Sequence, residues 1–335
     1  MDFPAIETPA VWQGVELFSR PDWLWTLSGS DVAELAQADQ QVAQLGLDQI
    51  TAESFRLPTL GPRLLSLQDT LENGSGAAMV RGCPVQDFSE EQVWRIFFGL
   101  STHLGTPVSQ SATGERLFHV RDEGFGLNDP RARGPNTSKR LSFHTDRCDV
   151  IGFMCLNQAK SGGENDVVSS AALYNEIQQR RPDLLAELMK PYYYQRHNVD
   201  LGNASPYCQQ PVFSFRDGHF AGCFLRVLIE RAYSAGDVAP MSEVQREALD
   251  FLEQVAEEPE LHVRFRQQPG DMLFLNNWVT FHRRTAFEDW PERERRRHVL
   301  RVWLSVPNSR PLDPLFRDNY GATEAGRIRG GMRPS

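Results

Sequence analysis

The sequence predicts a mainly β fold with flanking helices, whose strands build a double-stranded β-helix, or jelly-roll, core. Strand patterns dominate the middle and the end of the chain, whereas helical patterns occur at the front and in one insertion. With 335 residues, 40% of them hydrophobic, the chain can bury a substantial core. Strands gathered in this way, with helices beside them, favour the jelly-roll class.

The helical patterns divide the chain into three expected parts. Residues 1–70 read as an N-terminal helical elaboration packed on the core, residues 71–310 as the β-rich domain with helical insertions, and residues 311–335 as a C-terminal tail. Helices are expected at about 30–45, from a capping box at Ser89 toward Leu104, at about 172–190, and from Ser242 onward.

Strands are expected where apolar residues alternate or form short runs between turn residues. The clearest segments are 151–155, 166–170, 272–275 and 298–304, and Gly-rich turns at 161–165 and 269–271 precede two of them. In 298–304 both faces carry large apolar side chains, so this strand is expected to be buried on each side.

His144-Thr145-Asp146 is the first motif that indicates chemistry. In a strand, residues i and i+2 point to the same face, so His144 and Asp146 would project together. With the distant His282 they would form a facial triad of two histidines and one carboxylate, which suits Fe(II) and oxygen chemistry. A core histidine beside a solvated aspartate is the alternative, because a lone His-x-Asp is a weak signal.

Arginines in the last predicted strand form the second motif. Arg297 and Arg301 share one face with Val299 and Trp303. A buried guanidinium is costly unless it meets an anion, and its planar shape pairs well with a carboxylate. These arginines therefore offer a clamp for a dicarboxylate, unless they bind internal Asp or Glu side chains instead.

Together these motifs resemble those of the taurine dioxygenase and 2,4-dichlorophenoxyacetate dioxygenase superfamily, which uses Fe(II) and 2-oxoglutarate and includes γ-butyrobetaine hydroxylase. The resemblance covers roughly residues 75–310 and rests on segments that are specific only in combination: 143–146, 162–165, 270–277, His282 and 297–301. It implies a clavaminate synthase-like jelly-roll core and an oxygenase that couples oxidation of an unactivated C–H bond, with hydroxylation favoured, to decarboxylation of 2-oxoglutarate into succinate and CO2.

The resemblance also implies roles for individual residues. His144, Asp146 and His282 would hold Fe(II), Arg297 would bind the distal carboxylate of 2-oxoglutarate, and O2 would be the second cosubstrate. Arg301 would lie near the cosubstrate or the substrate. Asn165 stands where relatives use threonine or serine, so its hydrogen bond to the cosubstrate departs from the family pattern.

The substrate is left open by the sequence. Four polar or cationic residues near the expected pocket are candidates for contacting a small molecule: Gln110, Arg140, Arg147 and Arg226. If one of these arginines enters the pocket, the substrate carries a carboxylate, sulfonate or phosphonate; surface ion pairs are the simpler alternative. Two other functions stay open, a non-catalytic jelly-roll protein that binds a small acid and a zinc hydrolase with the same triad.

Composition indicates an ordinary cytoplasmic enzyme. A net charge of -9 argues against nucleic-acid binding. No apolar run is long enough for a membrane span, and the first residues lack the pattern of a signal peptide. Five cysteines at irregular spacing fit a reducing compartment, with Cys148 expected to pack rather than to face the site. A homo-oligomer is compatible with the sequence. The polar segment 112–140 is expected to be either a surface loop or an active-site lid.

Overall fold

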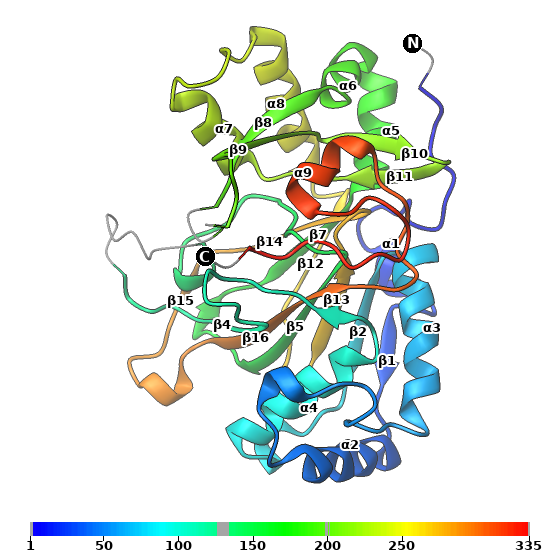
Figure 1. The fold of residues 1–335 in the computed structure, drawn as a ribbon, viewed down its shortest axis with the longest axis vertical. Helices are drawn as coiled ribbons and strands as arrows, with labels where there is room; N and C mark the ends of the chain where they lie inside the picture. The colour runs from blue at the N-terminus through cyan, green and yellow to red at the C-terminus, as the bar shows by residue number, and fades with distance from the viewer. Residues whose placement is uncertain (1–2, 126–133, 198–199, 201, 334–335) are drawn as a thin grey trace.

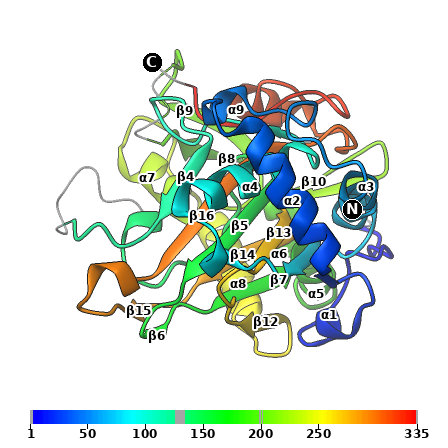
Figure 2. The same cartoon turned by 90° about the horizontal axis from the view of Figure 1, so that it is seen from below.

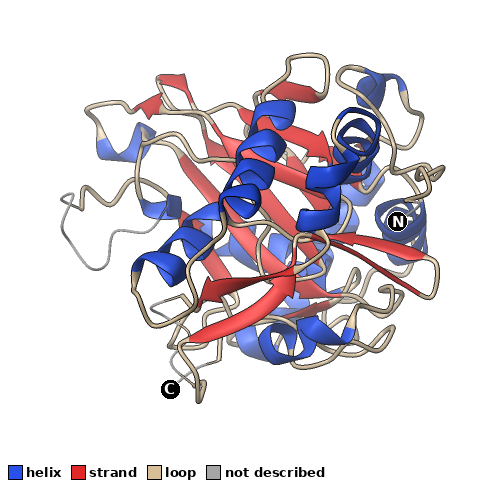
Figure 3. Cartoon of the chain, turned by 90° about the horizontal axis from the view of Figure 1, so that it is seen from above, coloured by secondary structure: helices blue, strands red, loops and turns tan. Residues whose placement is uncertain are grey.

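Two larger β-sheets lie between two groups of helices in the computed structural model (Figure 1). The structure describes residues 3–125, 134–197, 200 and 202–333. Seen from above, the strands run through the middle of the molecule and helices flank them on both sides (Figure 3). The architecture is therefore a mixed, sheet-rich one with helical cover, as the sequence predicts.

The larger sheet has seven strands in the order β1-β2-β13-β5-β16-β3, and β4 also pairs with β16. Except for the parallel pair β1 and β2, its neighbours are antiparallel. Every residue of β16 is buried, so this strand is covered on both faces as expected. The strands are β1 (Leu24–Thr26), β2 (Ala77–Arg81), β3 (Thr106–Pro107), β4 (Leu117–Val120), β5 (Val150–Asn157), β13 (Met272–Asn276) and β16 (His298–Ser305).

The smaller sheet has three antiparallel strands in the order β12-β7-β14. These are β7 (Asn165–Ser169), β12 (His262–Phe265) and β14 (Thr280–Arg284). Three two-stranded ribbons complete the β structure: β6 (Ser161–Gly162) with β15 (Phe287–Glu288), β8 (Pro191–Gln195) with β9 (Tyr207–Pro211), and β10 (Phe213–Arg216) with β11 (His219–Gly222).

The two larger sheets share one layer of apolar side chains. Val167 and Val263 from the smaller sheet belong to the same buried cluster as Met79, Leu275 and Trp303 from the larger one. Burial of such side chains is the main favourable term in holding the layers together. Residues on the inner faces of the two sheets are thus placed opposite each other.

Helices cover the outer faces of both sheets (Figures 1 and 2). On the larger sheet, α2 (Gly29–Val42), α3 (Leu60–Asn73) and α4 (Glu90–Thr102) contribute to one core cluster with β13 and β16. On the smaller sheet, α5 (Ser170–Arg180), α6 (Pro182–Leu188) and α8 (Glu243–Ala256) contribute to another. The remaining helices are α1 (Glu16–Ser19), α7 (Arg226–Ser234) and α9 (Arg317–Tyr320).

Local sequence signals explain where most helices begin and end. Capping boxes start α4 at Ser89 and α8 at Ser242, as the sequence predicts. The helical pattern expected over 172–190 is instead two helices, α5 and α6. Pro182 starts the second of them, because proline cannot donate the backbone hydrogen bond that a continuous helix needs.

The C-terminal residues 311–333 lie against the core rather than away from it. The guanidinium of Arg329 donates to Asp149 at 2.6 Å, and both side chains are 0% exposed. The amide of Gly330 donates to the carbonyl of Tyr320, and that of Gly331 to the carbonyl of Arg147.

No helix in the described part of the chain is long and apolar enough to cross a bilayer.

Candidate metal and cosubstrate site

His144 and His282 are brought together by the backbone. They form an isolated antiparallel bridge in which each amide donates to the other residue's carbonyl at 3.0 Å. The sequence predicts a strand through Asp146, but the pairing ends after His144. The amide of Thr145 donates to Phe224, and that of Asp146 donates to the side chain of Asn277. Asp146 is thus held by Asn277, and not by a continuing ladder.

The ligand atoms of His144, Asp146 and His282 all lie within 4.8 Å of one another. The Nε2 atom of His144 is 3.9 Å, and that of His282 3.4 Å, from Oδ2 of Asp146. His144 Nδ1 lies 2.9 Å from the carbonyl of Ser142, so it carries the proton and leaves the Nε2 lone pair facing Asp146. The buried Oδ2 of Asp146 has no hydrogen-bond partner among the described residues. A metal ion among these atoms would satisfy all three.

Electrostatics favours the protonation states that a metal requires. Burial, together with the nearby His282, lowers the pKa of His144 to about 4, so its imidazole is neutral at physiological pH. Burial opposes ionisation of Asp146, but the charge of Arg301 and the nearby His282 outweigh it and hold the pKa of this carboxyl below its usual value. A neutral His144 and an ionised Asp146 fit a divalent metal.

Arg301 lies beside this triad. Its Nη1 is 3.5 Å from Oδ1 of Asp146, and its Nε donates to Oε1 of Gln110 at 2.7 Å. Its guanidinium also lies over the rings of Phe118 and Trp303. Gln110 thus orients Arg301. The sequence suggested Gln110 as a substrate contact, but Gln110 is not among the residues that line the large cavity.

A second cationic site is built around Arg297. This side chain is buried, its Nη1 has no hydrogen-bond partner among the described residues, and burial lowers its pKa to about 10. Arg284 is also buried, and burial together with the charge of Arg297 lowers its pKa to about 9. The guanidinium carbons of Arg297 and Arg284 lie 5.3 and 4.7 Å from the centre of the same ring, that of Phe287. Two buried like charges this close favour binding of an anion.

Strand register places Asn165 at this second site. Asn165 pairs with Arg284 across β7 and β14, and His282 pairs with Val167. Directly opposite residues share a face, so Asn165 and Arg284 point to the same side of the sheet as His282. In the preceding turn, a Cβ on Gly163 would lie 3.2 Å from Nε of Arg297. The Nδ2 of Asn165 donates to Gln267 at 3.2 Å, which leaves its role toward a cosubstrate a prediction.

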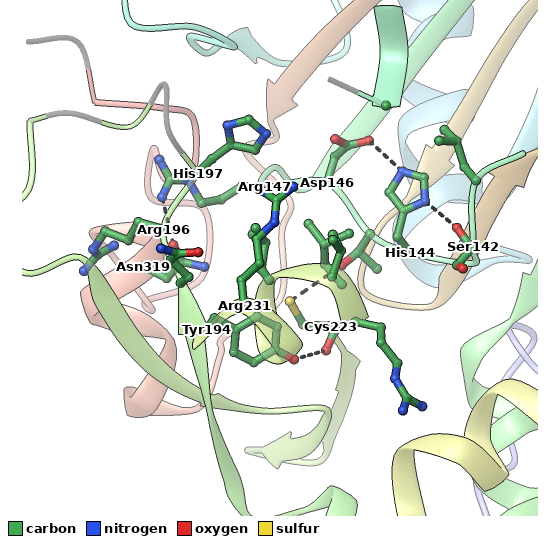
Figure 4. A pocket seen from close by; sticks show the side chains of 18 of the residues that line it. Ser142, His144, Asp146, Arg147, Tyr194, Arg196, His197, Cys223, Arg231 and Asn319 are labelled. Carbon is green, nitrogen blue, oxygen red and sulfur yellow. Dashed lines mark hydrogen bonds and ion pairs between the residues drawn. The ribbon is translucent and has the colours of Figure 1, made fainter. Parts of the chain in front are cut away.

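A cavity of about 890 Å³ opens beside the triad and is lined by His144, Asp146 and Arg301 (Figure 4). Of the substrate candidates that the sequence indicates, Arg140, Arg147 and Arg226 also line it. The guanidinium of Arg140 pairs with Glu257, and that of Arg226 with three carboxylates: Glu230, Asp250 and Glu253. Their roles toward a substrate remain predictions.

Three further arginines lie at these sites and are not marked by a strong sequence pattern. Arg284 follows His282 at i+2, the same spacing that joins His144 to Asp146. In a strand this spacing places Arg284 on the same face as His282, and it is the one signal in the sequence that could have identified Arg284. Arg196 and Arg231 line the cavity from β8's end and from α7. No local pattern marks them, because only the tertiary fold brings these segments to the triad.

The structure also bears on the expected packing of Cys148 and on the segment 112–140, for which a surface loop or an active-site lid was expected. Cys148 is buried in the apolar layer between the sheets and accepts a hydrogen bond from Asn277 at 3.1 Å, which confirms that it packs. In the segment 112–140, residues Leu117–Val120 form β4 and pair with β16 instead of belonging to a loop. Gly134, Pro135 and Arg140 line the cavity, whereas the middle of the predicted lid, residues 126–133, lies outside the described residues.

Comparison with known proteins identifies the family of this chain. The family described as Taurine catabolism dioxygenase TauD, TfdA family matches residues 40–303. The chain is 32% identical over 309 residues to FR-33289 synthase of Streptomyces rubellomurinus, covering 90% of each protein. It is 28% identical to the taurine hydroxylase-like protein SAT17 of Stachybotrys chartarum, covering 91% of this chain and 83% of the relative.

A solved structure of asparagine oxygenase with Fe(II), 2S,3S-3-hydroxyasparagine and succinate has a similar fold, with a TM-score of 0.64 at 17% identity. The match covers 84% of this chain and 93% of that one. The fold and the site thus define a non-haem iron, 2-oxoglutarate-dependent dioxygenase. The chain belongs to the TauD, TfdA family.

Proposed function

We propose that this protein hydroxylates a C–H bond of a small molecule with Fe(II) held by His144, Asp146 and His282, and with 2-oxoglutarate as cosubstrate. The observation that carries this assignment is the convergence of three ligand atoms within 4.8 Å around a carboxylate oxygen that has no partner among the described residues. Two histidines and one carboxylate leave open positions for a chelating cosubstrate and for O2. The carboxylate of Asp146 would supply the oxygen ligand of the iron beside the two histidine nitrogens.

An iron ion held by this triad would activate O2, the oxidant that couples decarboxylation of 2-oxoglutarate to succinate and CO2 with hydroxylation of the substrate. The chain's own residues orient the reactants. Ser142 fixes the tautomer of His144, and Arg301 balances the charge of Asp146. Arg297, with Arg284 beside it, would bind the distal carboxylate of 2-oxoglutarate, whose charge relieves the repulsion between these two guanidinium groups.

The remaining expectations extend this proposal. The two facing sheets, with their shared apolar layer, support a double-stranded β-helix core for residues 71–310. Residues 1–70 supply α1, α2 and most of α3 together with β1, and fit the proposed helical elaboration. All five cysteines are unpaired and buried, which supports a cytoplasmic location. Asn165 is proposed to hydrogen-bond the cosubstrate from the face it shares with Arg284.

Succinate formation tests this function. Protein loaded anaerobically with Fe(II) and 2-oxoglutarate, then exposed to O2, is expected to produce succinate slowly even without substrate, because the cosubstrate alone can be decarboxylated. The Asp146→Ala variant should produce none, and Zn(II)-loaded protein should also produce none. Wild-type protein that forms no succinate but hydrolyses esters or amides with Zn(II) would instead support the hydrolase alternative, and binding of 2-oxoglutarate without any turnover would support the non-catalytic one.

A further inference from the structure

The cavity beside the triad is also lined by arginines that the proposed reaction does not use. Arg147, Arg196 and Arg231 all line this cavity, and they come from three separate segments: the residue after the triad's Asp146, the end of β8, and α7. In Figure 4, Arg196 and His144 lie on opposite sides of the pocket, and Arg231 lies between them.

Arg147 and Arg196 share one buried carboxylate. The Nη1 of Arg147 lies 2.6 Å from Oδ2 of Asp200, and the Nη1 of Arg196 lies 4.0 Å from the same oxygen. Arg147 also donates to Asn319, and Arg196 pairs with Asp318, whose side chain is 59% exposed. Asp200 is therefore the shared counter-ion of Arg147 and Arg196, whose side chains are only 9% and 4% exposed.

Both guanidinium groups retain unused donors. The Nε of Arg147 and the Nη1 of Arg196 are buried, and neither has a hydrogen-bond partner in the part of the chain that the structure describes. A buried donor without an acceptor is costly. An anionic oxygen bound in the cavity within reach of either donor would relieve this cost.

Arg231 adds a charge without a counter-ion. Among the described residues its guanidinium has no ion pair and no hydrogen bond, and its side chain is labelled in the pocket of Figure 4. Arg226, on the same helix, contrasts with it because three carboxylates surround that guanidinium. Asp200 and Asp318 balance two of the three guanidinium groups of Arg147, Arg196 and Arg231, so this group of side chains carries one excess positive charge.

We propose that Arg196 and Arg231, with Arg147 behind them, form a subsite for a phosphate, phosphonate or sulfonate group of the substrate. Three guanidinium groups approaching from different segments suit a tetrahedral anion with several oxygens, whereas a planar carboxylate is matched by one arginine in a bidentate pair. Naming the bound molecule the substrate rests on the proposed function. The anion-binding site itself does not.

Binding of small anions to the full-length protein tests this subsite. Isothermal titration calorimetry with methylphosphonate, methanesulfonate and acetate is done with and without Fe(II), so that the result does not depend on turnover. We expect the two tetrahedral anions to bind better than acetate. Loss of one charged contact should weaken methylphosphonate binding by at least about tenfold in Arg231→Gln and in Arg196→Gln.

Three control variants distinguish this subsite from a general charge effect and from the iron and cosubstrate sites. Arg216→Gln removes an equal charge from the β10–β11 ribbon outside the cavity and should leave the Kd unchanged. His144→Ala and Arg297→Gln disable the proposed iron and cosubstrate sites and should also retain methylphosphonate binding. If His144→Ala loses Fe(II) binding but keeps methylphosphonate binding, the anion subsite is independent of the proposed iron site.

Several results would overturn the proposal. They are equal binding of acetate, a loss that appears only in Arg297→Gln, and a decrease in Arg216→Gln as large as in Arg231→Gln. Unchanged binding in Arg231→Gln would do so too, and this variant is informative even if Arg196→Gln fails to fold, because Arg231 is exposed.

Discussion

Replacing Arg297 by glutamine should remove recognition of the distal carboxylate of 2-oxoglutarate while leaving the metal site intact. Arg297 is buried, its Nη1 lacks a partner among the described residues, and it lies with Arg284 against the ring of Phe287. Among the described residues, no hydrogen bond or ion pair joins Arg297 to His144, Asp146 or His282. The variant should therefore bind Fe(II) as the wild type does.

The size of the effect follows from the burial of this group. Removing one partner of a buried ion pair costs about 3 to 5 kcal/mol, because the other charge is left without compensation. At about 1.4 kcal/mol per factor of ten, the Kd for 2-oxoglutarate should rise roughly a hundredfold to a few thousandfold. The remaining guanidinium of Arg284 limits the loss, so the lower part of this range is expected.

A comparison of two oxo acids isolates the distal carboxylate. Calorimetric Kd values are measured anaerobically on Fe(II)-loaded protein for 2-oxoglutarate and for 2-oxobutanoate, which lacks that carboxylate. Wild-type protein should strongly prefer 2-oxoglutarate, and Arg297→Gln should lose most of this preference. Arg295→Gln is the matched control, since Arg295 is half exposed and stacks on Trp290.

An unchanged preference for 2-oxoglutarate in Arg297→Gln would refute the reasoning, because a different group would then bind the distal carboxylate. Equal weakening of both oxo acids would also count against it, since that outcome indicates damage to the chelating end. Circular dichroism of each variant establishes that the fold is retained before either result is interpreted.

Three other perturbations are predicted from the structure. Arg284→Gln should raise the Kd for 2-oxoglutarate by about tenfold, measured by calorimetry, because it removes the second cation of the cosubstrate site. Burial and the neighbouring His119 lower the pKa of His298 to about 4, so below pH 6.5 the unfolded chain takes up a proton that the folded one does not, and stability falls as pH decreases toward 4. In His298→Gln that dependence, followed by urea denaturation of the metal-free protein, should weaken by about 1.4 kcal/mol per pH unit. Arg329→Gln should lower the free energy of unfolding by about 3 to 5 kcal/mol in the same assay, because Asp149 loses its buried partner.

Each of these three expectations has a contradicting result. An unchanged Kd in the Arg284 variant would place the cosubstrate away from that residue. Parallel stability curves for wild type and His298→Gln between pH 7 and pH 5 would show that this histidine does not titrate with folding. Wild-type stability of Arg329→Gln would mean that the C-terminal residues contribute little to the core.

The parts of the fold that the sequence predicts correctly depend on short-range patterns. The capping boxes at Ser89 and Ser242 mark real helix starts, and the alternation in 298–304 marks a strand buried on both faces. These signals work because hydrogen bonding and burial act over a few residues.

Other features depend on contacts between distant segments. The strand expected through Asp146 ends at His144 because Asn277, 131 residues away, accepts the amide hydrogen bond of Asp146. Arg196 and Arg231 become pocket residues only when β8 and α7 fold beside the triad. The triad itself is predictable because its residue types and spacing have a chemical reason, whereas an isolated arginine has none.

Anaerobic equilibrium binding of Fe(II) tests most directly whether His144, Asp146 and His282 hold one iron ion, on which the proposed reaction depends. Wild-type protein should bind one Fe(II) per chain at the triad. His144→Ala and Asp146→Ala should each lose this binding, while Arg231→Gln should keep it. Full Fe(II) binding by both triad variants, or no specific binding by the wild type, would contradict the assignment of the triad as the iron site.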